Sequence, residues 1–121
     1  MSDEHMTYSG VVMHGEKTGA KLGFPTANIP LNNTNISGIY AAKVTVGDGS
    51  YDAGVYVNTK RNILEAHLLD FSGDLYDTTI AVTLYKKIRE DKDFVAPMNT
   101  AELSKMIADD IVSVRKYFEK P

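Results

Sequence analysis

Apolar and polar residues alternate with a period of two through much of the segment 7–88, and this period predicts β-strands. In residues 38–47, the clearest case, Tyr40, Ala42 and Val44 share one face, while Lys43 and Thr45 lie on the other. Shorter segments rich in Val, Ile and Thr follow the same rule. The predicted strands are residues 7–14, 38–47, 51–58, 63–70 and 78–88.

Short turns separate these predicted strands. The sequence Gly47-Asp48-Gly49-Ser50 is typical of a tight β-hairpin. Residues 59–62 form a second, polar turn, and Phe71-Ser72-Gly73-Asp74 forms a third. Short connections of this kind favour antiparallel pairing, because parallel strands need long crossovers.

A single amphipathic helix is predicted after the strands. Asn99 is a suitable N-cap, and Glu102 stands three residues later, as in a capping box. The apolar positions recur at helical spacing and form one stripe for core packing. They are Leu103, Met106, Ile107, Ile111, Val114 and Phe118. Five or six strands followed by one helix predict a small antiparallel β-barrel that the helix closes at one side or end.

Composition is that of one ordinary globular domain, which we expect to span residues 1–121. The 121 residues are 43% hydrophobic and 24% charged. A net charge of −3 argues against a nucleic-acid surface. The absence of cysteine excludes disulfides and thiol catalysis. With no apolar run of membrane-spanning length and no signal-peptide pattern, we expect a cytoplasmic protein without membrane association. We also expect a monomer.

The segment 15–30, GEKTGAKLGFPTANIP, contains the richest candidate chemistry. Its glycines allow close approach of the backbone to a ligand, and Lys17 and Lys21 suit phosphate oxygens. Thr26 and Asn28 offer hard oxygen atoms of the kind that Mg²⁺ prefers. Neither the P-loop pattern nor the dinucleotide pattern GxGxxG is present. On spacing alone, a mobile surface loop is an equally valid interpretation.

Glu65 is a second candidate. The alternation of segment 63–70 places it on one face with Ile63 and Leu69, and an unpaired carboxylate among apolar groups is costly. From the residues alone, the favoured interpretation is that Glu65 lies near the strand end and reaches water or a lysine. The alternative is a general base at the mouth of a barrel. The charged run 89–94 is, on its own, typical of a solvated surface.

Several ordered segments resemble the riboflavin kinase (flavokinase) family. The run GAKLGFPTANIP is similar to its signature G-R-x-L-G-F/I-P-T-A-N. Gly38-Ile39-Tyr40 matches the strand that follows that signature, and residues 65–76 match E-x-H-L/I-L-D-F-x-x-D-L-Y. Residues 88–94 and 110–115 match two later blocks of the family. The resemblance therefore covers nearly the whole chain.

The resemblance implies a six-stranded antiparallel Greek-key β-barrel with a C-terminal helix, and transfer of the γ-phosphate of ATP to riboflavin to give FMN and ADP. It implies Mg²⁺, or another divalent cation such as Zn²⁺ or Mn²⁺, held partly by Thr26 and Asn28. Glu65 would be the catalytic base near the ribityl 5′-hydroxyl. The implied nucleotide-binding residues are Gly15, Lys21, Thr26, Asn28, Leu68, Asp70 and Tyr76, and the implied flavin-binding residues are Arg89, Lys92 and Phe94.

Two departures from the family pattern leave alternatives open. Ala20 stands where the family has arginine, and the loop at 58–62 is shorter than the family's N-I-G-x-R/N-P segment. A non-catalytic flavin- or nucleotide-binding module on the same barrel is therefore the second hypothesis, and an unrelated β-barrel interaction domain is the third. The family kinase is often joined to an adenylyltransferase, for which 121 residues leave no room, so we expect a stand-alone kinase domain.

Overall fold

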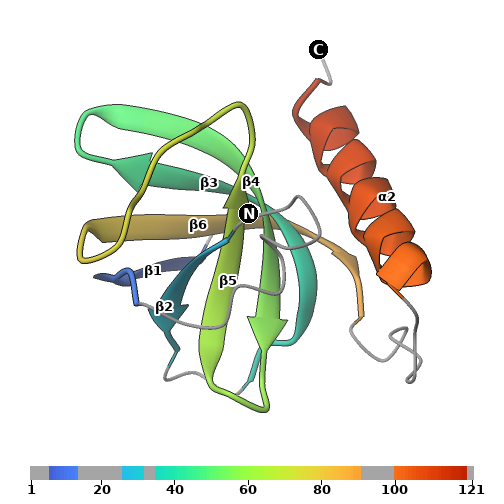
Figure 1. Ribbon diagram of the computed structural model, residues 1–121, viewed down its shortest axis with the longest axis horizontal. Coiled ribbons are helices and arrows are strands. Elements are labelled where there is room, and N and C mark those ends of the chain that lie inside the picture. The colour runs from blue at the N-terminus through green and yellow to red at the C-terminus, as the bar shows by residue number, and fades with distance from the viewer. Residues whose placement is uncertain (1–5, 14–25, 32–34, 91–99, 120–121) are drawn as a thin grey trace, which may run out of the picture.

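The described residues form a six-stranded sheet, which curls into a barrel with one helix against its side (Figure 1). A computed structural model describes residues 6–13, 26–31, 35–90 and 100–119. The strands are β1 (Met6–Val11), β2 (Ala27–Pro30), β3 (Gly38–Val46), β4 (Gly49–Asn58), β5 (Ile63–Leu68) and β6 (Thr79–Arg89), and the helix is α2 (Thr100–Phe118).

The strands form one sheet in the order β1-β6-β3-β4-β5-β2, and every neighbouring pair is antiparallel. The two edge strands of the sheet, β1 and β2, also approach each other. Just after β1, the Met13 N–H donates to the Asn28 carbonyl oxygen at 2.8 Å. Gly10 leaves the space for this approach, since a Cβ there would lie 3.2 Å from Ile29 Cβ. The sheet therefore curls into a nearly closed barrel, which confirms the predicted architecture.

The alternation pattern located five strands correctly but did not locate β2. This strand has four residues, ends in a proline and pairs with β5, which lies far along the chain. Its conformation depends on that partner rather than on a local pattern. The predicted hairpin is present as the two-residue loop Gly47-Asp48, with Gly47 at a φ of 56°.

The inner faces of the strands fill the barrel with branched apolar side chains. Ala42 and Val44 of β3 point inward, as the alternation predicted, and both are fully buried. The largest fully buried side chains of this interior are Val12, Ile29, Val44, Val55, Val57, Leu64, Ile80 and Val82. The polar residues of the same strands consequently lie on the outer face.

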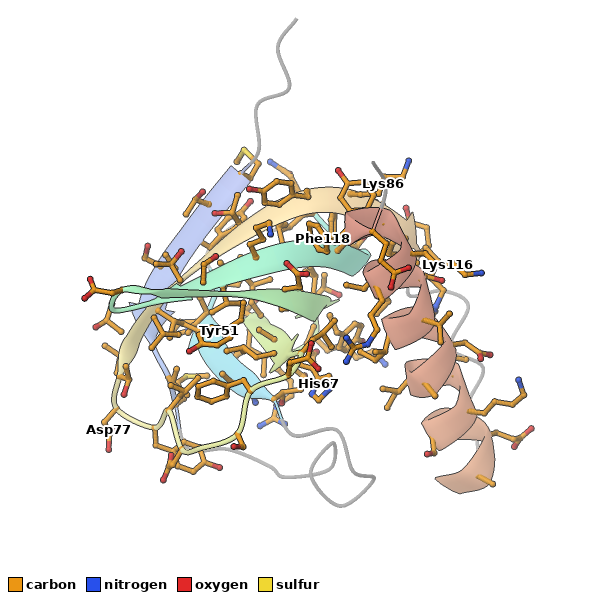
Figure 2. All side chains as sticks on the ribbon, turned by 90° about the horizontal axis from the view of Figure 1, so that it is seen from above. Tyr51, His67, Asp77, Lys86, Lys116 and Phe118 are labelled. Atoms are coloured by element: carbon orange, nitrogen blue, oxygen red, sulfur yellow. The ribbon has the colours of Figure 1, made fainter. Side chains whose placement is uncertain are left out.

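Helix α2 packs its apolar stripe on the outer face of the sheet, where Val114 is buried with Ala41 and Leu69. Gly54 permits the close approach, since a Cβ there would lie 3.3 Å from Ile111 Cδ1. Phe118 lies near the end of the helix (Figure 2), and its ring meets that of Tyr85 edge to face at 5.7 Å. The predicted helix is confirmed, while its predicted cap, Asn99, lies outside the described residues. In the part of the chain that the structure describes, no helix has the length and apolar character to cross a membrane.

Candidate active site

The strand register places three of the sequence-predicted site residues in one row on the outer face of the barrel. Asn28 of β2 is opposite Glu65 of β5, which is opposite Tyr56 of β4. The row continues through Ile39 of β3 to Arg89 of β6. Directly opposed residues of antiparallel strands share a face, with Cβ atoms about 4.5–5.5 Å apart. Asn28 and Glu65 are thus neighbours, and Arg89 is at the other end of the row.

Asn28 carries a buried acceptor without a hydrogen bond. The residue is 8% exposed, and its Oδ1 has no hydrogen-bond partner among the described residues. Leaving such a group unsatisfied costs about 1–3 kcal/mol, so an unmet buried acceptor calls for an explanation. An amide oxygen beside a carboxylate is a donor set that suits a hard divalent cation.

Thr26, the other predicted metal ligand, immediately precedes β2 and is half-buried. Within the described ranges, no cluster of three or more His, Cys, Asp or Glu side chains forms a complete metal cage. Thr26 and Asn28 fit a site in which the protein supplies only part of the coordination shell, as is usual for Mg²⁺ bound together with phosphates.

Glu65 lies in the middle of β5 and is half-buried, rather than solvated at the strand end. Its described partner is an amide and not a lysine: Asn58 Nδ2 donates to Glu65 Oε2 at 2.9 Å. The described residues donate no hydrogen bond to Oε1. One carboxylate oxygen is therefore held by Asn58, and the other has no hydrogen-bond donor among the described residues.

Of the residues predicted to border the nucleotide, Leu68, Asp70 and Tyr76 differ in their surroundings. Leu68 points into the barrel core. Tyr76 packs against that core, and its backbone N–H donates to Asp74 Oδ1 at 2.8 Å. The connection after β5 begins beside α2 and reaches Asp77 on the far side of the barrel from the helix (Figure 2). Asp70 and Tyr76 thus occupy different parts of one long connection.

Asp70 is exposed and adopts a φ of 58°, a left-handed conformation that is uncommon outside glycine but in which aspartate is enriched. Both oxygens of its carboxylate accept hydrogen bonds from the Arg115 guanidinium at 3.1 Å. This hydrogen bonding and the positive charge of Arg115 lower the pKa of Asp70 below its ordinary value of 3.8. The pair ties the start of the connection to α2.

Arg89, which was predicted to bind the flavin, forms an ion pair with Asp110 of α2. Its Nε and Nη2 donate to the two carboxylate oxygens of Asp110, each at 2.8 Å. The side chains are only 18% and 12% exposed. A groove of about 530 Å³ opens between the end of β6 and α2, and its lining includes Ile88, Arg89, Met106 and Asp110.

Asn58 and Asp110 contact the predicted site residues, although neither was expected in the site from sequence. Asp110 could have been noticed in the sequence, because it lies within the apolar stripe of the helix, four residues from both Met106 and Val114. An acidic residue at such a position needs a partner. Asn58 left no comparable signal. Gly15, Lys21, Lys92 and Phe94, also predicted for the site, lie outside the described residues.

The chain is similar to known proteins over nearly all of its length. The sequence model of the family described as riboflavin kinase matches residues 2–118. The bifunctional riboflavin kinase/FMN adenylyltransferase of Buchnera aphidicola (subspecies Schizaphis graminum) is 39% identical over 125 aligned residues, which cover 91% of this chain. That alignment covers 38% of the Buchnera protein, so the chain spans about two fifths of the length of this curated relative.

Two crystal structures share the fold at 25% sequence identity. One is a riboflavin kinase from Trypanosoma brucei, with a TM-score of 0.63 over 95% of this chain and 80% of that one. The other is described as a macrolide-efflux protein from Streptococcus pneumoniae, with a TM-score of 0.77 over 92% of this chain and 38% of that one.

Proposed function

The chain belongs to the riboflavin kinase family, and from that premise we propose that it transfers the γ-phosphate of ATP to the ribityl 5′-hydroxyl of riboflavin, giving FMN and ADP. The observation that carries the proposal is the register pair on β2 and β5, in which a buried amide oxygen without a partner among the described residues neighbours a carboxylate. Phosphoryl transfer depends mainly on positioning and on neutralising charge, and these two groups suit the two tasks.

Glu65 is the proposed general base. Its Oε1 accepts the proton of the riboflavin 5′-hydroxyl as that oxygen forms a bond to the γ-phosphorus. The bond from the γ-phosphorus to the β–γ bridging oxygen breaks, and ADP leaves with the electron pair. The role requires a heavy-atom distance of about 2.6–3.2 Å between carboxylate and hydroxyl. The hydrogen bond from Asn58 to Oε2 supports the proposal, because it leaves Oε1 available.

Thr26 and Asn28 would hold a divalent cation, for which Mg²⁺ is our first choice and Mn²⁺ or Zn²⁺ the alternatives. Such a cation, when bound, neutralises charge on the phosphate oxygens. The unmet acceptor of Asn28 supports this assignment independently of the family likeness.

We assign the substrates to opposite ends of the row. The nucleotide is proposed to lie near Thr26, Asn28 and the connection that includes Asp70 and Tyr76, with Gly15 and Lys21 covering it. Leu68 contributes through its backbone, since its side chain is in the core. The flavin is proposed to lie at the groove beside Arg89, with Lys92 and Phe94 nearby.

Residues 1–121 are proposed to act as one kinase domain and as a monomer. A cytoplasmic location, where ATP is available, stays a prediction.

The test is a direct assay of the purified chain. Riboflavin and Mg²⁺ are incubated with ATP, CTP or GTP in parallel, and products are separated by chromatography with fluorescence detection. FMN and the nucleoside diphosphate are expected in equal amounts. Riboflavin binding without FMN formation from any of the three would overturn the proposal in favour of a non-catalytic flavin-binding module.

A further inference from the structure

Asn58 makes two side-chain hydrogen bonds that connect Glu65 to a turn. Its Nδ2 donates to Glu65 Oε2 at 2.9 Å, and its Oδ1 accepts from the Arg61 backbone N–H at 3.2 Å. We propose that Asn58 is a positioning residue, which fixes the carboxylate of Glu65 for phosphoryl transfer without touching either substrate. The inference rests on the function proposed above.

Strand geometry brings the two side chains together. Asn58 is the last residue of β4 and is opposite Ile63 of β5, so Glu65 is its diagonal neighbour. The preceding Val57 points into the barrel core, and Asn58 therefore lies on the outer face with Glu65. Diagonal neighbours in an antiparallel pair lie about 7–8 Å apart, which long polar side chains can span.

The two partners also fix which way the Asn58 amide faces. A backbone N–H can only donate, so it requires the amide oxygen, whereas an ionised carboxylate can only accept, so it requires the amide nitrogen. Both requirements are met by one orientation of the amide. The backbone between β4 and β5 therefore fixes the Asn58 side chain, and Asn58 fixes the carboxylate of Glu65.

The hydrogen bond from Asn58 should affect the rate of phosphoryl transfer, because a general base must keep its carboxylate oxygen close to the proton that it accepts. A glutamate side chain has several rotatable bonds, and its carboxylate can also rotate to present either oxygen. The hydrogen bond from Asn58 occupies Oε2 and so restricts the rotation of the carboxylate, which leaves Oε1 as the oxygen for the substrate proton. Misplacing a reacting group by about 1 Å can lower a rate by about 10²-fold, so loss of this support should reduce turnover and not affinity.

The experiment separates positioning from a merely structural role in the turn. Asn58→Leu removes both hydrogen bonds, whereas Asn58→Asp keeps the acceptor for the Arg61 N–H, removes the amide donor and places a second carboxylate beside Glu65. Both substitutions at Asn58 are introduced into the wild-type protein and into Glu65→Gln. FMN formation is then followed at saturating and limiting riboflavin. Lys60→Ala, an exposed change in the same turn, is the control.

We expect both variants to lower kcat by about 10–100-fold, with each KM within about two-fold of wild type and Lys60→Ala unchanged. In Glu65→Gln, the same substitutions should change kcat by less than about two-fold, since they act through the base. Equal losses of kcat in the wild-type and Glu65→Gln backgrounds, or a wild-type kcat in Asn58→Asp, would show that Asn58 only stabilises the turn. Either result would overturn the inference. FMN formation by the wild type sustains the proposed function in either case, whereas its absence overturns both.

Discussion

At the scale of single residues, Asn28 is an unusual occupant of its strand position. A strand position that is nearly sealed from solvent would normally hold an apolar residue, and here it holds an amide whose oxygen has no partner among the described residues. Groups of this kind lower stability unless a ligand satisfies them. We interpret the unmet acceptor as the cost of a binding site.

Replacing Asn28 by the near-isosteric leucine should therefore separate the two properties. The unfolding free energy without ligand is expected to stay constant or to rise by up to about 1 kcal/mol, because the unsatisfied acceptor is removed. FMN formation and the rise in melting temperature caused by Mg²⁺ and ADP should both be lost.

The control for this variant is Thr45→Val, another exchange of a polar for an apolar residue, at an exposed position of β3 outside the row. It should keep both the activity and the ligand-induced rise. Full activity in Asn28→Leu would show that the amide oxygen is not a ligand of the reaction centre.

Sequence alone singled out Thr26, Asn28 and Glu65, because motif residues can be read one by one. It did not show that Asn28 and Glu65 are neighbours, since this depends on the pairing of two strands that are distant in the chain. Asn58 escaped notice for a related reason: a polar residue before a turn is common, and only the register reveals its diagonal contact with Glu65.

At the scale of elements, α2 is bound to the barrel by two ion pairs of opposite polarity. Its Asp110 accepts from Arg89 at the end of β6, and its Arg115 donates to Asp70 after β5. The first pair is largely buried and the second is exposed, so they should respond differently to mutation and to solution conditions.

Asp110→Ala should destabilise the fold strongly, because it leaves the guanidinium of Arg89 partly buried without its carboxylate. We expect a loss of about 2–4 kcal/mol in unfolding free energy, measured by urea denaturation. The matched control is Asp109→Ala, which removes the neighbouring carboxylate, 67% exposed and 3.3 Å from Lys105 Nζ, and should cost less than about 0.5 kcal/mol.

The double variant Arg89→Met with Asp110→Leu should recover much of that loss, since apolar groups can replace a buried pair. Equal effects of the variants at positions 109 and 110 would contradict a buried ion pair between α2 and β6.

The exposed pair predicts a pH dependence. Because Arg115 lowers the pKa of Asp70, the pair stabilises the folded state above the ordinary pKa of 3.8, and this contribution is lost as pH falls through the lower, folded value. Arg115→Gln should therefore melt below wild type at pH 6–7, and the difference should shrink at pH values below 3.8 and at high salt.

Lys116→Gln serves as the control, because it removes a positive charge at the next exposed position. Its difference in melting temperature from wild type should not shrink as the pH falls. A difference for Arg115→Gln that is constant from neutral to acid pH would contradict the assigned pair.

The elements themselves were largely predictable. Strong alternation marks strands whose inner face is buried, and helical spacing marks α2, so both appeared in the sequence. Strand β2 did not, because its four residues are too few to show a period. Its place in the sheet is set by β5 on one side and by the contact with Met13 on the other.

At the scale of the whole molecule, the strand order brings the residues of the proposed site together. The order β1-β6-β3-β4-β5-β2 brings the strand after the glycine-rich segment beside the strand of Glu65, and α2 covers the opposite end of the same row. Alternation determines which face a residue occupies but not which strand lies next to it. The barrel was therefore implied by the family resemblance, while the row from Asn28 to Arg89 emerged only from the register.

The most direct test of this arrangement is single-turnover transfer of labelled γ-phosphate from ATP to riboflavin, compared between wild type and Glu65→Gln. We predict that wild type forms labelled FMN and that Glu65→Gln is slower by about 10²–10⁴-fold, with riboflavin affinity within about two-fold. His67→Gln, on the same face of β5, should stay within about three-fold of wild type. A Glu65→Gln rate equal to that of wild type would contradict a reaction centre built on the Asn28–Glu65 pair.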